Sequence, residues 1–341
     1  MKNPVIKWSL IIITWALVAV GIWQSSLPYY AERNYREGFN LSASQLTIEA
    51  IPYLERSVEL APWETQYLTE LGKAYEDYAN ALPDLSQKQT YFKKAEEIYV
   101  RTIELDPKNP WFYSRYGSLT RQMVSVFPAQ GEHYLTLTNS LYREAAEYDP
   151  KNPLFQLNLA YYYHQLGEFE NAKKYYLMCI DMDPGMSIAR FNLANIYYME
   201  RLPEKSLEQY LEIHKREPQF KNLSLAIALV YSNQNKYADA LPYLEESRQY
   251  DPNNIEILKN LASFYFYIQA YDKAAATYEE LFRRFPSAQQ TSKEPYLQAV
   301  LKIGAIDRAL FFLTQYTQLF PEDGYAKSQL QSIKDIHSKN Q

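Results

Sequence analysis

Apolar residues recur at intervals of three and four along most of this chain, which is the pattern of amphipathic helices. Between residues 152 and 184 the first apolar stripe comprises Leu154, Leu157, Ala160 and Tyr161. A second stripe comprises Ala172, Tyr175, Tyr176, Cys179 and Ile180. Gly167 separates the stripes, and Pro184 ends the second one because proline cannot continue a helix. The pattern predicts two helices joined by a turn at Gly167.

This two-helix pattern repeats every 34 residues. The interval is marked by Pro150, Pro184, Pro218, Pro252 and Pro286. Ten residues after the first four prolines stand Ala160, Ala194, Ala228 and Ala262, and three residues further on stand Tyr163, Tyr197, Tyr231 and Tyr265. Similarity at a fixed period of this length indicates stacked repeats. We therefore predict an all-α, right-handed α-solenoid, in which each repeat packs against its neighbours.

The proline interval extends to both sides of this central block. Further repeats end near Pro62, Pro107 and Pro321, which gives about eight repeats between residues 29 and 323. The repeats ending at Pro107 and Pro150 are 45 and 43 residues long instead of 34. We expect their extra residues in loops near residues 79–90 and 124–134. Residues 324–341 predict a capping helix, because apolar positions between 325 and 337 share one side and polar positions the other.

The N-terminal segment has a different pattern, with no charged residue from Trp8 to Leu27. Twenty helical residues would span about 30 Å, the thickness of a bilayer's hydrocarbon core. Trp8 and Trp23 bracket the run, as aromatic residues do at membrane interfaces. We predict that residues 1–28 are a membrane anchor, with residues 8–27 crossing the bilayer. A cleaved signal peptide and a buried helix are the alternatives, although no A-x-A cleavage site follows the apolar run.

The charges flanking the apolar segment bear on its orientation. Lys2 and Lys7 precede it, whereas Arg33 and Arg36 after it are balanced by neighbouring acidic residues. Positive charge favours the cytoplasmic side of a span. We therefore predict a cytoplasmic N-terminus and an extracytoplasmic array, which in a Gram-negative bacterium would lie in the periplasm.

The composition narrows the classes of function. The chain has 341 residues, 47% of them hydrophobic, and a formal net charge of −5. A folded protein is expected, and an acidic balance argues against nucleic-acid binding. Its single cysteine, Cys179, cannot form an internal disulfide, and its place on an apolar stripe predicts a buried structural residue.

The chain lacks the residue patterns of common catalytic sites. None of its four histidines stands in H-E-x-x-H, and neither a phosphate-binding G-x-x-x-x-G-K-[ST] nor G-x-S-x-G occurs. Asp181 and Asp183 resemble paired catalytic carboxylates, but an aspartate before proline recurs at several repeat ends and indicates a turn. Lys93, Lys94 and the pair at residues 173–174 are expected on solvated helix surfaces. We predict no enzymatic activity, no metal site and no cofactor.

Together these features resemble the tetratricopeptide repeat (TPR) family. The resemblance covers roughly residues 29–322 and is carried by Leu71, Gly72, Tyr75, Tyr163, Gly167, Ala172, Tyr176, Pro184, Ala240, Leu244, Pro252, Ala274, Tyr278 and Pro286. It implies a scaffold that binds protein or peptide partners in a concave groove lined by the first helix of each repeat.

A second, looser resemblance is to the C-terminal periplasmic portion of O-antigen ligase and polymerase-like envelope proteins. The segments W-A-L-V-A-V-G-I-W and E-L-A-P-W-E-T-Q-Y carry it. It implies a cell-envelope setting. The many-span catalytic part of those enzymes has no counterpart in this sequence, so no glycosyl-transfer residue is carried over.

The TPR resemblance also implies which residues line the groove, at about 7, 8, 11 and 14 residues after each proline. The candidates for partner binding are Asn158, Tyr161, His164, Phe191, Asn192, Asn195, Tyr198, Leu229, Ser232, Lys259, Asn260, Ser263 and Phe266. Amide side chains can bind a peptide backbone, and aromatic side chains supply contact area. For each of them the alternative is that it only packs or is solvated, and His164 is expected to be polar lining rather than a metal ligand.

Two other kinds of ligand bear on this groove, an acidic peptide and a sugar. A carboxylate clamp for acidic peptides is not expected, because Leu157, Phe191 and Leu225 stand where it needs charge. Aromatic and amide side chains could instead stack on sugars. The chain would then be an accessory protein of surface polysaccharide ligation, polymerisation or export, binding glycan or a glycan-handling enzyme.

Overall fold

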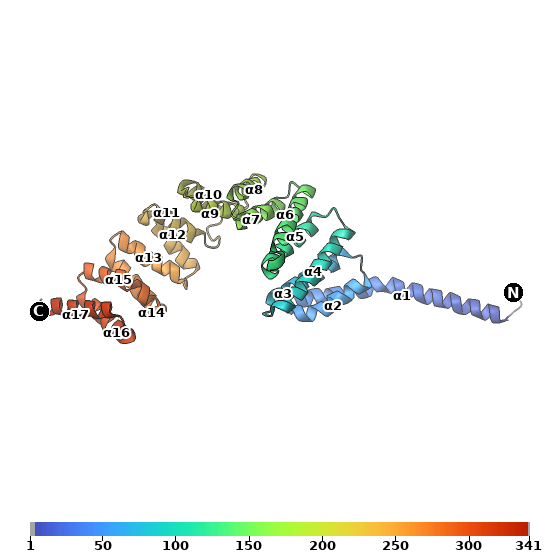
Figure 1. Cartoon of the computed structure of the whole chain (residues 1–341), viewed down its shortest axis with the longest axis horizontal. Coiled ribbons are helices and arrows are strands. Elements are labelled where there is room, and N and C mark those ends of the chain that lie inside the picture. The colour runs from blue at the N-terminus through green and yellow to red at the C-terminus, as the bar shows by residue number, and fades with distance from the viewer. Residues whose placement is uncertain (1–3, 340–341) are drawn as a thin grey trace. The chain divides into compact units, whose positions relative to one another are not determined.

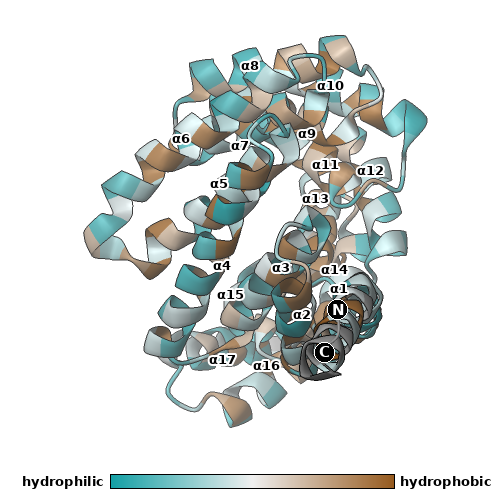
Figure 2. Cartoon of the chain, turned by 90° about the vertical axis from the view of Figure 1, so that its right-hand side faces the viewer, coloured by the Kyte–Doolittle hydropathy of each residue, from teal (hydrophilic) through white to brown (hydrophobic). Residues whose placement is uncertain are grey.

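The computed structural model describes residues 4–339, and these residues form seventeen α-helices, a short 3-10 turn and no strand (Figure 1). The chain divides between residues 183 and 184 into two compact modules, which we call the N-terminal and C-terminal modules. In Figure 2, hydrophobic and hydrophilic residues alternate along most helices, as expected where one side of each helix is buried. The predicted helical solenoid of TPR type is confirmed.

The N-terminal module contains α1 (Pro4–Ala43), α2 (Thr47–Leu60), α3 (Thr65–Ala81), α4 (Leu85–Leu105), α5 (Pro110–Val126), the turn η1 (Pro128–Gln130), α6 (Gly131–Tyr148), α7 (Pro153–Gln165) and α8 (Phe169–Met182). The C-terminal module contains α9 (Ser187–Met199), α10 (Pro203–Arg216), α11 (Leu223–Asn233), α12 (Tyr237–Tyr250), α13 (Ile255–Tyr267), α14 (Tyr271–Arg284), α15 (Ala288–Lys302), α16 (Ile306–Leu319) and α17 (Gly324–Lys339). Within each module, successive helices pack against one another in pairs.

A left-handed residue joins the two helices in each repeat of ordinary length. It stands seventeen or eighteen residues after the preceding proline, at Gln45, Gly167, Arg201, Asn235, Gln269 and Gly304. At the predicted Gly167 turn φ is +74°, and the amide of Glu168 donates to the carbonyl of Tyr163 at 2.9 Å. This is the Schellman arrangement, which satisfies carbonyl groups at a helix end and favours glycine at the left-handed position.

The two lengthened repeats do not contain the loops that the sequence predicts. Helices α4 and α6 have 21 and 18 residues, whereas α8 has 14. The connection from α3 to α4 is only residues 82–84, and η1 fills the connection from α5 to α6. No described residue in either connection has a positive φ. The prediction of loop insertions was wrong, because without the left-handed turn these residues extend the helices.

Helix α1 runs without interruption from the apolar segment into the first repeat, so the predicted boundary at residues 28 and 29 lies inside it. Pro28 stands 34 residues before Pro62, which makes residues 29–43 the first helix of the first repeat. Gly38 there is buried, and a Cβ atom on it would lie 2.7 Å from the Leu54 side chain. Among the described residues, Ile12–Ala43 is the one helix long and apolar enough to cross a bilayer.

Helix α17 is the first helix of a further repeat that has no second helix within the described residues. Ala326 and Ile333 are buried. Gln331 occupies the repeat position held by Ala160 in an internal repeat, but it is exposed, as are Lys327 and Lys334. A polar outer side of this kind ends a solenoid without exposing an apolar face.

Candidate partner-binding face

Five buried tyrosines occupy one repeat position, eight residues before the closing proline. They are Tyr99, Tyr142, Tyr176, Tyr210 and Tyr278. Each hydroxyl group is hydrogen-bonded to a polar side chain on the first helix of its own repeat, and the partners in the same order are Glu76, Ser118, His164, Asn195 and Ser263. A buried hydroxyl group requires such a partner, so these polar residues complete the core.

The charge state of these tyrosines follows from their burial. Burial raises the pKa of the Tyr99, Tyr176, Tyr210 and Tyr278 hydroxyl groups. They therefore stay protonated at neutral pH and can donate a hydrogen bond. Where the tyrosine position holds Leu244 instead, 34 residues after Tyr210, the partner position holds Leu229, 34 residues after Asn195.

All thirteen predicted groove residues lie on the first helices α7, α9, α11 and α13. Three of them, His164, Asn195 and Ser263, are the tyrosine partners just described. Asn158, Tyr161 and His164 belong to the N-terminal module and the other ten to the C-terminal module.

Several of the remaining candidates form hydrogen bonds, an ion pair or ring contacts with other residues of the protein. Asn158 Nδ2 donates to Ser114 Oγ at 2.8 Å, and Asn192 Nδ2 to the Ile188 carbonyl at 2.8 Å. The Lys259 ammonium pairs with Glu256 at 2.9 Å. Aromatic contacts, measured between ring centroids, join Tyr161 to Tyr176 at 6.0 Å, Phe191 to Tyr210 at 5.4 Å and Phe266 to Tyr271 at 5.3 Å. Leu229, Ser232 and Asn260 are half-buried.

An exposed row that the sequence offsets missed lies one residue further along each first helix. In the C-terminal module, at intervals of 34, it contains Met199, Asn233, Tyr267 and Leu301. The three apolar members expose 50%, 57% and 41% of their surface. The row thus presents apolar surface at one position in three of four repeats. The sequence did contain a signal for this row, because Met199, Tyr267 and Leu301 are apolar residues near the ends of helices, outside the apolar stripe that is buried.

A cleft of about 420 Å³ opens beside this row. Its lining residues are Tyr198, Arg201, Pro203, Asn233 and Gln234. Asn233 Nδ2 donates to the Tyr198 hydroxyl group at 2.7 Å, which joins two neighbouring repeats across the cleft. Tyr198, one of the predicted groove residues, therefore lines this cleft and directly precedes Met199 of the exposed row. We call the row and this cleft together the apolar face.

In the N-terminal module the corresponding position holds Ala43 in the first repeat and polar residues in the next three. The polar residues are Asp77, Gln122 and Gln165. Gln122 Nε2 donates to Glu76 Oε1 at 2.5 Å, and Asn80 Nδ2 donates to Gln122 Oε1 at 3.0 Å. These bonds tie α3 to α5, so polar side chains that could have met a partner are used between repeats.

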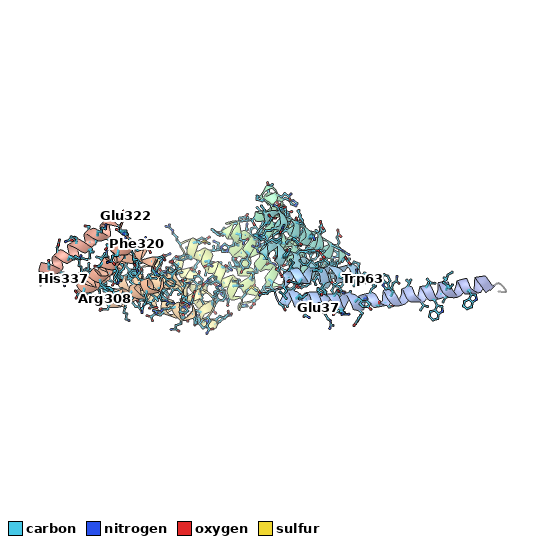
Figure 3. All side chains as sticks on the ribbon, turned by 90° about the horizontal axis from the view of Figure 1, so that it is seen from below. Glu37, Trp63, Arg308, Phe320, Glu322 and His337 are labelled. Atoms are coloured by element: carbon cyan, nitrogen blue, oxygen red, sulfur yellow. The ribbon has the colours of Figure 1, made fainter. Side chains whose placement is uncertain are left out.

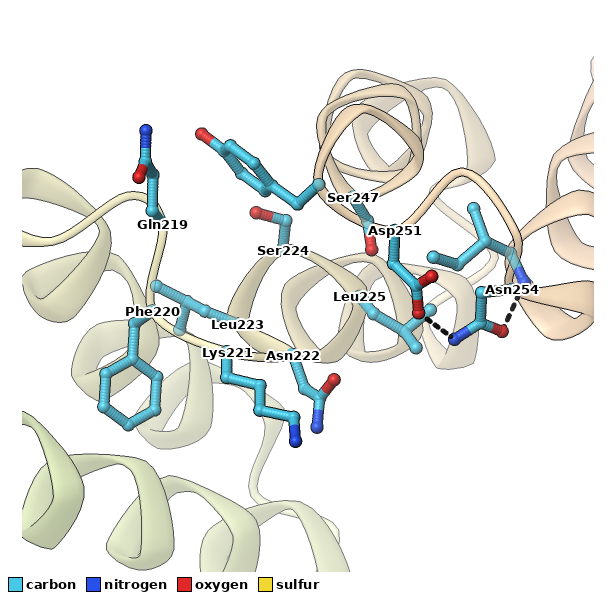
Figure 4. Close-up of a pocket in the computed structure, with 12 residues that line it drawn as sticks. Gln219, Phe220, Lys221, Asn222, Leu223, Ser224, Leu225, Ser247, Asp251 and Asn254 are labelled. Atoms are coloured by element: carbon cyan, nitrogen blue, oxygen red, sulfur yellow. Dashed lines mark hydrogen bonds between the residues drawn. The ribbon is translucent and has the colours of Figure 1, made fainter. Parts of the chain in front are cut away.

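Figure 4 shows a second cleft in the C-terminal module, of about 340 Å³, between the loop before α11 and the end of α12. Asn222 precedes α11 with a φ of +64°. Asn254 Nδ2 donates to Asp251 Oδ2 at 3.0 Å, and Asn254 Oδ1 accepts from the Glu256 amide at 3.0 Å. Both polar side chains therefore serve the turn, as the recurring aspartates before proline predict.

Comparison with known proteins supports the repeat assignment. Family models described as tetratricopeptide repeat match residues 155–186 and 233–292. The chain contains tetratricopeptide repeats. A model of the plant-specific mitochondrial import receptor subunit TOM20 matches residues 39–122, which include the first lengthened repeat. No curated protein matches the chain.

Solved TPR structures resemble the chain at low identity. A thermophilic TPR protein of Thermus thermophilus is 18% identical, covering 59% of this chain and 99% of that one, with a TM-score of 0.45. PilF of Pseudomonas aeruginosa is 18% identical over 68% and 97% of the chains, with a TM-score of 0.48. A TPR protein of Parabacteroides merdae is 18% identical over 79% and 98%, with a TM-score of 0.47. No conclusion about function follows from similarity at this sequence identity and TM-score. The resemblance to O-antigen ligases stays a prediction.

The TPR core accounts for the residues that could have suggested chemistry. Cys179 is fully buried, its Sγ lies 3.3 Å from the Pro153 carbonyl oxygen, and burial raises its pKa to about 12. Such a thiol is a packing residue, because the reactive form is the thiolate. Within residues 4–339, no group of three or more His, Cys, Asp or Glu side chains could hold a metal ion.

Three of the four lysines predicted to be solvated are half-buried, namely Lys93, Lys94 and Lys173, whereas Lys174 is exposed. Lys93 Nζ lies 2.5 Å from the Tyr134 hydroxyl group and 2.7 Å from Glu96. Lys94 Nζ lies over the Tyr91 ring, 5.0 Å from its centroid. Both side chains are half-buried, because their aliphatic stems cover aromatic surface while the ammonium groups meet rings and carboxylates.

Proposed function

We propose that the protein is a membrane-anchored TPR scaffold that binds a protein or peptide partner on the apolar face of its C-terminal module. TPR repeats indicate a protein-interaction scaffold. The observation that carries the location is the exposed row of Met199, Tyr267 and Leu301, which occupy one position in three of four successive repeats. The proposal includes no catalytic step.

The chemistry of the apolar face suits a peptide with apolar side chains. Methionine adapts its shape to different partners, and tyrosine combines a large contact area with a polar end. The cleft beside Tyr198 and Asn233 can take one side chain, while the Asn233 amide is placed to meet a peptide backbone. Arg201, exposed at the edge of the cleft, favours an acidic group next to that side chain.

The membrane part of the proposal is supported by helix α1. Trp15, Leu17 and Trp23 expose between 61% and 69% of their surface, so the protein itself offers no cover for this segment. A bilayer would cover it. The flanking charges favour a cytoplasmic N-terminus and an array outside the cytoplasm, in the periplasm of a Gram-negative cell envelope.

Glycan binding, the alternative weighed from the sequence, gains no specific observation. A sugar-binding surface combines aromatic rings with polar groups that bond hydroxyl groups. In the apolar face Tyr267 stands between Asn233 and Leu301, with Met199 beyond, so three of its four positions are apolar. A surface with three apolar positions out of four binds apolar side chains of a partner better than it binds sugar hydroxyl groups.

The proposal is tested by quantitative affinity purification of the full chain from solubilised membranes. We expect a double variant, Met199→Ala with Tyr267→Ala, to lose a specific partner by about tenfold or more, since truncating anchors of this kind costs above ~1.4 kcal/mol. The matched control is Asp77→Ala with Gln165→Ala, at the same repeat position of the N-terminal module. Equal recovery of every bound protein by the two double variants would remove the proposal.

A further inference from the structure

No linker separates the apolar segment from the first repeat. Helix α1 is continuous through Leu27 and Pro28, and Ala31, four residues after Leu27, is already buried in the array. At a rise of about 1.5 Å per residue, Ala31 lies only about 6 Å beyond the end of the apolar run. The headgroup region of a bilayer is about 5–8 Å deep on each side. If residues 8–27 span the membrane, as proposed above, the base of the first repeat lies at headgroup depth.

The loop between α2 and α3 lies beside the same part of α1, just beyond the apolar run. Tyr67, near the start of α3, donates its hydroxyl hydrogen to Glu32 Oε2 at 2.8 Å, and its ring stacks on Tyr35 with centroids 4.7 Å apart. Trp63 precedes Tyr67 by four residues, in the loop itself. Figure 3 shows Trp63 at the edge of the array, next to the part of α1 that extends away from it.

Trp63 is exposed at this edge. It exposes 60% of its surface, and within the described residues no ring contact or hydrogen bond engages it. Tryptophan is uncommon at such exposure in water but enriched at membrane interfaces, where its ring is apolar and its N–H group remains hydrated. Tyr29 and Tyr30 on α1, exposing 68% and 47%, stand at the same end of the first repeat.

A cleft of about 490 Å³ between α1 and α2 is a second observation that points to contact with lipid headgroups. It is lined by Tyr30, Arg33, Asn34, Glu37 and Tyr53. Within residues 4–339, neither Arg33 nor Glu37 has an ion pair or side-chain hydrogen bond, whereas the neighbouring Arg36 pairs with Glu32 at 2.6 Å. A free guanidinium group six residues beyond the apolar run can reach lipid phosphates.

We infer that the first repeat is seated on the bilayer surface, with the Trp63 ring in the headgroup layer of phospholipids and Arg33 facing their phosphates. The inference rests on the proposed membrane anchor and goes beyond it, because a span alone leaves the array free of the lipid. The seat, together with the rigid helix α1, fixes the tilt of the first repeats relative to the membrane.

The test uses three full-length proteins in phospholipid nanodiscs, each with a single tryptophan and phenylalanine at the other tryptophan positions. One keeps Trp23 inside the span, one keeps Trp63, and one carries Ser44→Trp at the exposed turn at the opposite end of the first repeat. The measurement is quenching of tryptophan fluorescence by brominated phospholipids. We expect the quenching of Trp63 to reach at least about half that of Trp23, and the Ser44→Trp protein to show about none.

The outcomes separate the two proposals. Quenching of Trp23, with Trp63 quenched no more than the Ser44→Trp protein, would overturn the seat and leave the anchor. Absence of quenching at Trp23 would remove the anchor, and the seat with it. Equal quenching of Trp63 and the Ser44→Trp protein would also overturn the seat, because it would show lipid contact without a preferred edge.

Discussion

The two modules use the same repeat position in opposite ways. In the N-terminal module it holds Ala43, Asp77, Gln122 and Gln165, and Gln122 bonds to both Glu76 and Asn80. In the C-terminal module it holds Met199, Asn233, Tyr267 and Leu301, and three of these expose a large apolar surface. One scaffold can therefore use a position either to tie its own helices together or to present a surface to a partner.

The lengthened helices help to explain the difference. Asn80 stands eighteen residues after Pro62, where the first helix of an ordinary repeat has already ended at its left-handed turn. Because α3 continues to Ala81, Asn80 is held on a helix and reaches Gln122. The extra helical turns thus add interrepeat hydrogen bonds, and the short repeats of the C-terminal module leave the equivalent surface open.

The largest effect is expected from removing the polar connection in the N-terminal module. Glu76→Ala deprives the buried Tyr99 hydroxyl group of its partner and the Gln122 amide of one of its two acceptors, the other being the Ser118 carbonyl. Leaving the buried hydroxyl group unpaired costs ~2–3 kcal/mol. Amide hydrogen exchange should show the lost protection in α3 to α5. The exposed neighbour provides the control, since Asp77→Ala should change stability by no more than ~0.5 kcal/mol. Unchanged protection in the Glu76 variant would show that the network does not stabilise this module.

A smaller effect is expected at the tyrosine position of the C-terminal module. Asn195→Leu leaves the buried Tyr210 hydroxyl group without its acceptor, at a cost of ~1–2 kcal/mol. Adding Tyr210→Leu gives this repeat the residue types that the next repeat has at the same two positions, Leu229 and Leu244. The double variant should therefore be more stable than the two single costs predict. Chemical denaturation of the four proteins measures this coupling, and strict additivity of the two changes would argue against it.

The smallest effect concerns pH and His164. Burial lowers the pKa of His164, which contacts the Tyr176 hydroxyl group at 3.2 Å. The unfolded chain therefore binds the proton more tightly, and stability falls as pH decreases through about 6.5. Because the ring is partly hydrated, we expect only a small loss of stability. Thermal denaturation at about pH 7.5 and 5.5 should show a weaker pH dependence for His164→Asn, with His133→Asn as the control.

The sequence predicted the repeats well because their period is carried by many residues at once. The left-handed turn at Gly167 and the turns at Asp183 and Asp251 follow from local chemistry that glycine and proline make visible. The sequence did not show whether the extra residues of the two lengthened repeats form loops or helices. Pro83 and Pro128 are compatible with either a loop or the start of a new helix.

The candidate site was predicted less well, for a physical reason. A one-residue change of offset rotates a helical side chain by about 100°, which separates half-buried Tyr198 from exposed Met199. The hydroxyl groups of the buried tyrosines also bind side chains that are distant in sequence. His164, Asn195 and Ser263 were therefore assigned to the groove, although their polar atoms face the core tyrosines.

The most direct test of the difference between the modules is site-specific photo-cross-linking in cells. A photoreactive amino acid is placed at Met199 or Tyr267 in the C-terminal module, and at Asp77 or Gln165 in the N-terminal module, all at the same repeat position. We predict that the first pair forms a cross-link to a common partner protein and that the second pair does not. Cross-links to that partner from Asp77 or Gln165, with none from Met199 or Tyr267, would contradict the account.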